Sequence, residues 1–262
     1  MKRLSGLVPW ALPVALIVFW EVAARVGWLS SRILPEPWAV ATAFWNLTES
    51  GELILHLRTS LWRAASGFAI GAGAGLLLGL LTGSVRRAET LLDTTLQMVR
   101  NIPALALIPL VILWFGIDES AKLFLLAVGV FFPVYLNTFH GIRTVDRGLV
   151  EMDRSYGLSR AELFWRIILP GALPSILVGL RYALGIMWLT LIVAETISAS
   201  SGIGYMTMNA REFLQTDVVL LGIIVYALLG KLADALTRAL ERRCLAWHPA
   251  YQGDGAAAGA PA

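Results

Sequence analysis

Long apolar segments recur along this chain of 262 residues, and they constrain its fold more than any other feature. A helix of about 20 apolar residues is long enough to cross a bilayer. Only 15% of the residues are charged and 57% are hydrophobic, which is typical of polytopic membrane proteins. The sequence therefore predicts an all-α fold with six transmembrane helices in a single domain, 1–262, whose core is about 57–240. The expected spans are residues 7–26, 61–83, 102–117, 121–140, 174–196 and 218–237.

Several classes of function are excluded by what the sequence contains. The net charge is only +3 and the basic residues are dispersed, which argues against nucleic-acid binding. Cys244 is the only cysteine, so no internal disulfide can form. His56, His140 and His248 lie far apart and have no metal-ligand spacing. No Gly-x-Ser-x-Gly elbow or Walker loop occurs, so we predict no covalent chemistry, no metal and no cofactor.

The N-terminal apolar segment has two interpretations. Lys2 and Arg3 before an apolar run suit a signal peptide, but no small-x-small cleavage site follows. A retained first span is favoured, with Glu21 and Arg25 paired at i,i+4 near its end. Residues 35–51 are Trp-rich and too short to span, so they are expected in the membrane interface.

The second apolar segment carries glycine at every fourth position. One face of the expected helix therefore lacks side chains along its length. Because glycine lowers helix stability, such a stripe needs a reason. Close backbone approach of another helix supplies that reason in membrane proteins. We predict helix packing at Gly67, Gly71, Gly75, Gly79 and Gly83.

A polar segment, residues 149–170, lies between the fourth and fifth apolar segments, and we call it the hook. Asp146 is a suitable N-cap for a first short helix. The apolar face of this helix consists of Leu149, Met152 and Tyr156. Gly157 stands where a left-handed residue ends such a helix, because glycine adopts positive φ without a Cβ clash.

The second half of the hook predicts another short helix. Ser159 and Glu162 have the spacing of a capping box, and Leu158 and Leu163 stand at the positions of a hydrophobic staple. Pro170 is expected to end this helix. The hook is either an amphipathic loop on the lipid headgroups or a docking element for a soluble partner, and the spacing alone leaves both possibilities open.

A resemblance favours docking. Glu151, Gly157 six positions later, and then Ile167, Leu169 and Pro170 resemble the EAA loop of ABC importer permeases, although Met152-Asp153 replaces the usual two alanines. In that family the loop couples the permease to a cytoplasmic ATPase. The resemblance implies a type I importer permease whose coupling residues are Glu151, Ser155, Gly157, Leu158, Ser159, Ile167, Leu169 and Pro170.

The resemblance extends over about residues 29–251. Strings such as FPVYLNTFHGI, ILPGALPSI and WLTLIVAETISASSGIGYM are similar to those of bacterial aliphatic sulfonate permeases. Permeases for taurine, nitrate and thiamine precursors are the related alternatives. The resemblance implies a homodimer in the lipid of a bacterial inner membrane, with cytoplasmic ABC ATPase subunits and a periplasmic substrate-binding protein. An alternative of another class is a membrane enzyme or sensor that anchors a soluble partner.

Charge placement predicts the orientation. With six spans both termini lie on one side, and the basic-rich side is cytoplasmic by the positive-inside rule. This places the hook in the cytoplasm. The cytoplasmic group is Lys2, Arg3, Arg86, Arg87, Arg100, Arg143, Arg147, Arg154, Arg160, Arg166, Arg238, Arg242 and Arg243. The opposite group is Arg25, Arg32, Arg58, Arg63, Lys122 and Arg211.

A translocation path needs polar side chains within the spans. Asn101, Asn137, Thr190 and Glu195 are the candidates, because polar groups in a bilayer are costly and point to function. Near the sixth span, Lys231, Asp234 and Arg238 are spaced for mutual pairing. The residues after about 252 are rich in Gly, Ala and Pro and predict a disordered tail.

Overall fold

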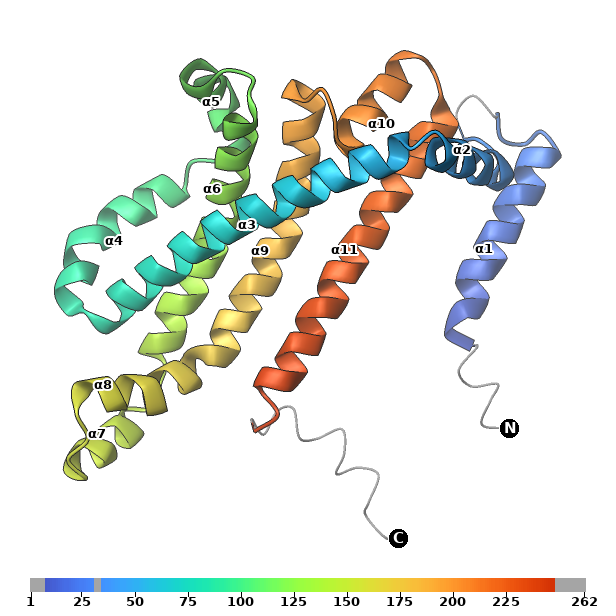
Figure 1. The fold of residues 1–262 in the computed structure, drawn as a ribbon. Helices are drawn as coiled ribbons and strands as arrows, with labels where there is room; N and C mark the ends of the chain where they lie inside the picture. Colours follow the sequence, from blue (N-terminus) through green and yellow to red (C-terminus); the bar gives the residue numbers. More distant parts are fainter. Residues whose placement is uncertain (1–7, 31–33, 248–262) are drawn as a thin grey trace, which may run out of the picture. The chain divides into compact units, whose positions relative to one another are not determined.

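The computed structural model describes residues 8–30 and 34–247, and every regular element among them is helical (Figure 1). The all-α prediction is confirmed. In chain order the elements are α1 (Val8–Arg25), α2 (Pro37–Glu49), α3 (Glu52–Ser84), α4 (Arg86–Arg100), the 3-10 helix η1 (Ala104–Leu107), α5 (Ile108–Phe115), α6 (Glu119–Arg143), α7 (Arg147–Ser155), α8 (Arg160–Leu163), the π-helix η2 (Phe164–Ile168), α9 (Leu169–Ser198), α10 (Ile203–Glu212) and α11 (Thr216–Cys244).

Some predictions fall on residues that the structure does not describe. These are the disordered tail at about 252–262, the basic residues Lys2, Arg3 and Arg32, and His248. The rest of the chain divides into two compact units. The first unit comprises Met1–Leu61 and Glu195–Leu228, and the second comprises Trp62–Ala194 and Leu229–Ala262. The predicted single domain stays a prediction.

Within the described residues, four helices are long and apolar enough to cross a membrane. They are α3, α6, the continuous helix Arg160–Ile197 and α11. A fifth candidate combines α4 with Ala104–Phe115, two parts that are bent by 82°. The 18-residue helix α1 occupies the first predicted segment and is not one of the candidates above. The count of six spans therefore stays a prediction.

The third predicted span, residues 102–117, is not one continuous helix, although part of it belongs to the bent fifth candidate. Helix α4 ends at Arg100, Pro103 is extended at φ −60° and ψ 127°, and α5 has only eight residues. Proline disfavours helical conformation in the residue before it, here Ile102. Pro109 lies in the first turn of α5, where its missing N–H breaks no helical hydrogen bond. The two prolines therefore begin helices, whereas Pro133 does lie inside α6.

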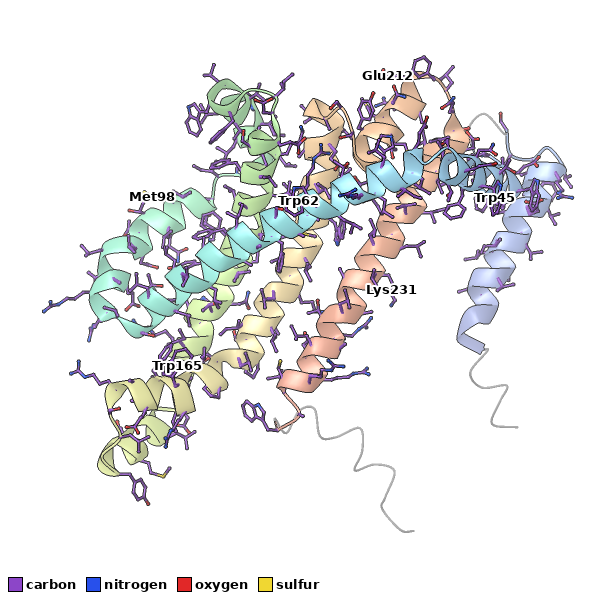
Figure 2. The ribbon with its side chains drawn as sticks, in the orientation of Figure 1. Trp45, Trp62, Met98, Trp165, Glu212 and Lys231 are labelled. Carbon is purple, nitrogen blue, oxygen red and sulfur yellow. The ribbon has the colours of Figure 1, made fainter. Side chains whose placement is uncertain are left out.

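The first unit has a small core in which α2 packs on α11. Val40 and Ala43 of α2 are buried with Leu221 of α11. The opposite face of α2 is exposed, and Trp45, labelled in Figure 2, is 67% accessible. A 13-residue helix with exposed tryptophan is consistent with a place in the membrane interface. On α1, Arg25 Nε donates to Glu21 Oε1 at 2.6 Å, as predicted.

The connector before α11 contains the short helix α10. Met206 and Ala210 are buried, but Phe213 is 69% exposed and does not share their face. The helix ends at Glu212, and Leu214 follows in the left-handed region with φ +57°. The chain has therefore turned before Phe213 could pack beside these two residues.

Candidate functional site

The first half of the hook is a helix that ends at a left-handed glycine. Asp146 Oδ1 accepts from the backbone N–H of Gly148 at 2.8 Å and caps α7. Gly157 has φ +81°, and no atom lies within 4 Å of a Cβ placed there. The constraint at Gly157 is therefore conformational and not steric. The apolar face predicted for α7 is open, with Leu149, Met152 and Tyr156 exposed by 47%, 49% and 75%.

The capping box of the second half is present. Ser159 Oγ accepts from Glu162 N–H at 3.3 Å, and Ser159 N–H donates to Glu162 Oε2 at 3.0 Å. Glu151, Ser155, Gly157 and Ser159 are exposed in the hook, whereas Leu158, Ile167, Leu169 and Pro170 are half-buried.

Pro170 does not end the second helix, which corrects the prediction. The helix continues from Arg160 to Ile197 through the π-helix η2, and Pro170 is the second residue of α9. Leu169 N–H donates to Phe164 O across the wider π turn. A change of hydrogen-bond pattern next to a proline lets the helix tolerate the missing N–H. The hook is thereby joined to α9 without a break.

A buried cluster connects the hook to the ends of α6 and α9. Ile142 of α6 packs with Ala172 and Ile176 of α9, and the hook residues Ile168 and Leu169 pack against this cluster. A Cβ on Gly141 would lie 3.0 Å from the carbonyl oxygen of Ala172, so the two helices approach closely here. Interiors that are packed this tightly transmit displacements.

The glycine stripe of α3 faces α6 along its length. A Cβ on Gly71 would lie 2.4 Å from Ala127 O, and one on Gly75 would lie 2.6 Å from Phe131 O. Both distances are far inside van der Waals contact, so only glycine permits this approach. The same holds at the other three positions, where the nearest atoms belong to Leu126 beside Gly67, Thr138 beside Gly79 and Ile142 beside Gly83.

The four predicted path residues have different surroundings. Asn137 borders a hollow in the second unit, where its Nδ2 donates to Pro133 O at 2.8 Å. Thr190 is buried, and its Oγ1 donates to Ile186 O at 2.9 Å. Asn101 is the exposed C-cap residue of α4. Glu195 belongs to the first unit.

Glu195 is buried at 1% exposure and is surrounded by hydrogen-bond donors. The Ser60 hydroxyl lies 2.8 Å from each carboxylate oxygen. Gly204 N–H and Tyr226 O–H both donate to Oε2 at 2.9 Å. Three helices, α3, α10 and α11, therefore contact one carboxylate on α9.

This carboxylate also serves as the cap of α10. Gly202 at the N-cap position has no side chain to accept from the first turn. Ile203 N–H donates instead to Ser60 Oγ at 2.8 Å, and Gly202 N–H donates to His56 Nδ1 at 3.1 Å. A negative charge at a helix N-terminus is favourable, and buried carboxylates need such partners.

Two ionic groups each include a pair that joins different helices in the second unit. Arg63 is buried and bonds Glu119 through Nε at 2.7 Å and Nη2 at 2.6 Å, and Lys122 Nζ lies 3.1 Å from Glu119 Oε1. Asp234 pairs with Arg238 at 2.5 Å, as predicted, and also with Arg181 at 2.9 Å. The Arg63–Glu119 and Arg181–Asp234 pairs join residues far apart in the chain, so no local spacing indicates them. No group of three metal-ligating side chains lies together in residues 8–30 and 34–247.

Comparison with known proteins connects this geometry to transport. The family described as "Binding-protein-dependent transport system inner membrane component" matches residues 71–245. The aliphatic sulfonates transport permease protein SsuC of Escherichia coli (strain K12) is 66% identical over 95% of this chain and 95% of its own length. SsuC of Bacillus subtilis (strain 168) is 48% identical over 96% of this chain and 91% of its own length.

Two more distant similarities complete the comparison. The taurine transport system permease protein TauC of Escherichia coli (strain K12) is 39% identical over 92% of this chain and 89% of its own length. A crystal structure of an amino acid ABC transporter with histidines aligns with a TM-score of 0.62 at 20% identity. It covers 76% of this chain and 97% of its own. That alignment supports the helical fold alone.

Proposed function

The chain belongs to the family of inner membrane components of binding-protein-dependent transport systems, and we propose that it is the permease subunit of an ATP-driven importer of aliphatic sulfonates. As a multi-pass component of a transport system it is not itself an enzyme. The substrate is inferred from two relatives that are named for aliphatic sulfonates. They align with 95% and 96% of this chain. Taurine is the nearest alternative, since that relative is 39% identical. Nitrate and thiamine precursors remain weaker alternatives.

The hook would couple this permease to cytoplasmic ATPase subunits. Support comes from the exposed apolar face of Leu149, Met152 and Tyr156, which suits helix-in-groove docking. The buried cluster around Ala172 would pass a displacement of the hook to α6 and α9. Closing and opening of the ATPases would then change which side of the membrane the path faces.

The proposed assembly is a homodimer of this chain with two ATPase subunits and a periplasmic binding protein. Both termini and the hook would lie in the cytoplasm, because the basic residues near the hook favour that side. The binding protein would deliver the sulfonate at the periplasmic face, where α10 and its connector are expected. The glycine face of α3 would hold α3 and α6 together within each copy.

Growth of a deletion strain tests the function. A strain that lacks this gene and every other sulfonate importer should fail to grow with an alkanesulfonate as sole sulfur source. It should grow on sulfate, and the returned gene should restore growth on the sulfonate. Growth of the deletion strain on alkanesulfonates would reject the substrate. Loss of growth on taurine, or of nitrate use, without loss on alkanesulfonates would assign the chain to one of the related permeases instead.

A further inference from the structure

A hollow of about 430 Å³ lies in the second unit, beside the middle of two candidate spans. Its walls include Phe132 and Asn137 of α6 and Tyr182 and Ile186 of α9. Since α6 runs over Glu119–Arg143 and α9 over Leu169–Ser198, these residues are near the centre of each helix. The hollow therefore lies along the inner parts of both helices and not at their ends.

Besides the walls from α6 and α9, the hollow has a third wall, which begins at Arg100. Helix α4 ends at this residue, and the chain bends by 82° before η1 and α5, which pack on α6 (Figure 1). Met98, labelled in Figure 2, marks this end of α4. The charge count in the sequence groups Arg100 with the cytoplasmic residues. The bend brings the end of α4 to the hollow beside α6, and the cytoplasmic grouping stays a prediction.

Arg100 has no counter-charge within the described parts of the chain. No ion pair or hydrogen bond involves its guanidinium there, and the side chain is exposed. Arg143, by contrast, pairs with Glu89 of α4, and Arg63 pairs with Glu119. Ionisable groups beside membrane-spanning helices are costly, so an arginine without a counter-charge next to two candidate spans points to a function.

The hollow combines this positive charge with apolar walls. The polar side chains in the lining are those of Arg100, Asn137 and Tyr182, and the larger apolar ones are those of Ile102, Val128, Phe132, Leu136 and Ile186. A guanidinium presents a planar set of donors that matches an oxyanion. The chemistry suits a small amphiphilic anion that has a charged head and a short apolar tail.

We propose that this hollow receives the alkanesulfonate during translocation, with Arg100 bound to the sulfonate group and Phe132 and Ile186 in contact with the alkyl chain. The proposal rests on the importer function proposed above and names the residues that serve it. A permanently charged sulfonate cannot cross hydrocarbon without compensating charge. A single exposed arginine binds such a group weakly enough to release it.

The hollow is also next to the region that the hook contacts. Ser175 Oγ of α9 donates to Asn137 O at 2.8 Å, and a Cβ on Gly179 would lie 2.5 Å from the Asn137 Cβ. Ser175 lies between Ala172 and Ile176 of the buried cluster against which Ile168 packs. A shift of α9 driven from the hook would therefore change the wall of the hollow at Asn137.

The test uses the complete transporter, with its ATPase and binding protein, in proteoliposomes. Arg100→Gln should lower ethanesulfonate uptake by about tenfold or more, because it removes a charge-assisted contact, and Arg100→Lys should retain part of the uptake. Arg87→Gln is the matched control, since Arg87 is an exposed arginine at the other end of α4 and does not border the hollow. It should transport like the wild type. Co-purification with the ATPase checks that each variant assembles.

A second variant tests the contact with the alkyl chain of the substrate. Ile186→Phe places a larger side chain in the apolar wall and narrows the hollow. The ratio of hexanesulfonate to ethanesulfonate uptake should therefore fall below that of the wild type. Wild-type uptake by Arg100→Gln, or loss of its assembly with the ATPase, would overturn the role of Arg100. An unchanged ratio for Ile186→Phe would overturn the role of the wall. A wild-type transporter that imports no alkanesulfonate would instead reject the proposed function itself.

Discussion

The hydroxyl of Ser60 on α3 lies 2.8 Å from both carboxylate oxygens of Glu195 on α9, and it also accepts from Ile203 N–H at the start of α10. This hydroxyl and this carboxylate together replace the missing local cap of α10. Tyr226 and Gly204 complete the set of donors. One buried acidic group thereby joins residues of four helices within the first unit.

Removal of this carboxylate should destabilise the protein strongly. Glu195→Leu leaves the donors of Ser60, Gly204 and Tyr226 without their acceptor, and each unsatisfied buried donor costs about 1–3 kcal/mol. Thermal unfolding in detergent should show a large fall in Tm. Tyr226→Phe removes only one donor and should cost about 1 kcal/mol. Glu212→Ala is the control, since Glu212 is an exposed acid at the end of α10 (Figure 2), and a fall as large there would contradict the cap.

Two glycines of α3 should respond oppositely to alanine. Gly71→Ala places a Cβ 2.4 Å from Ala127 O, so the helices must separate, at a cost of about 1–3 kcal/mol. Gly73→Ala meets nothing within 4 Å and should leave Tm unchanged or raise it, because alanine favours helix. Thermal unfolding of both variants in one detergent makes the comparison. Equal Tm values for the two variants would show that the close approach of α3 and α6 does not limit the stability of the protein.

The bend at Gly157 should tolerate asparagine but not valine. With φ at +81° and open space around the Cβ, the only constraint is backbone conformation, which asparagine can adopt and a β-branched residue resists. Gly157→Val should reach the membrane at normal levels yet lose most sulfonate uptake and ATPase co-purification. Gly157→Asn should retain both. Normal transport by the valine variant would remove Gly157 from coupling.

Cysteine labelling tests the proposed orientation. Cys244 is the only native cysteine, so Cys244→Ser gives a background free of thiols. In it, Ser159→Cys should react with an impermeant maleimide only from the cytoplasmic side, and Ser200→Cys only from the periplasmic side. Both positions are exposed, so accessibility does not limit the reaction. Labelling of both from the same side would reject the six-span orientation.

The sequence by itself determined the features that depend on neighbours in the chain. Apolar length gave the long helices α3, α6, α9 and α11, because the bilayer and the helix rise fix that length. The capping box of Ser159 and Glu162 and the positive φ of Gly157 also followed, since caps act within three or four residues. Each of these needs only the local backbone.

Tertiary structure decided what depends on residues far apart. Ser60 is 135 positions from Glu195, and Tyr226 is 31 positions from it, so no spacing indicates their shared hydrogen bonds. The bend after α4 brings Arg100 beside α6, and no spacing in the sequence indicates this neighbour. Pro170 remains inside a helix because a π turn before it changes the hydrogen-bond pattern. Such contacts form only when packing brings distant segments together, since local propensity is weaker than the free energy of burying and pairing their side chains.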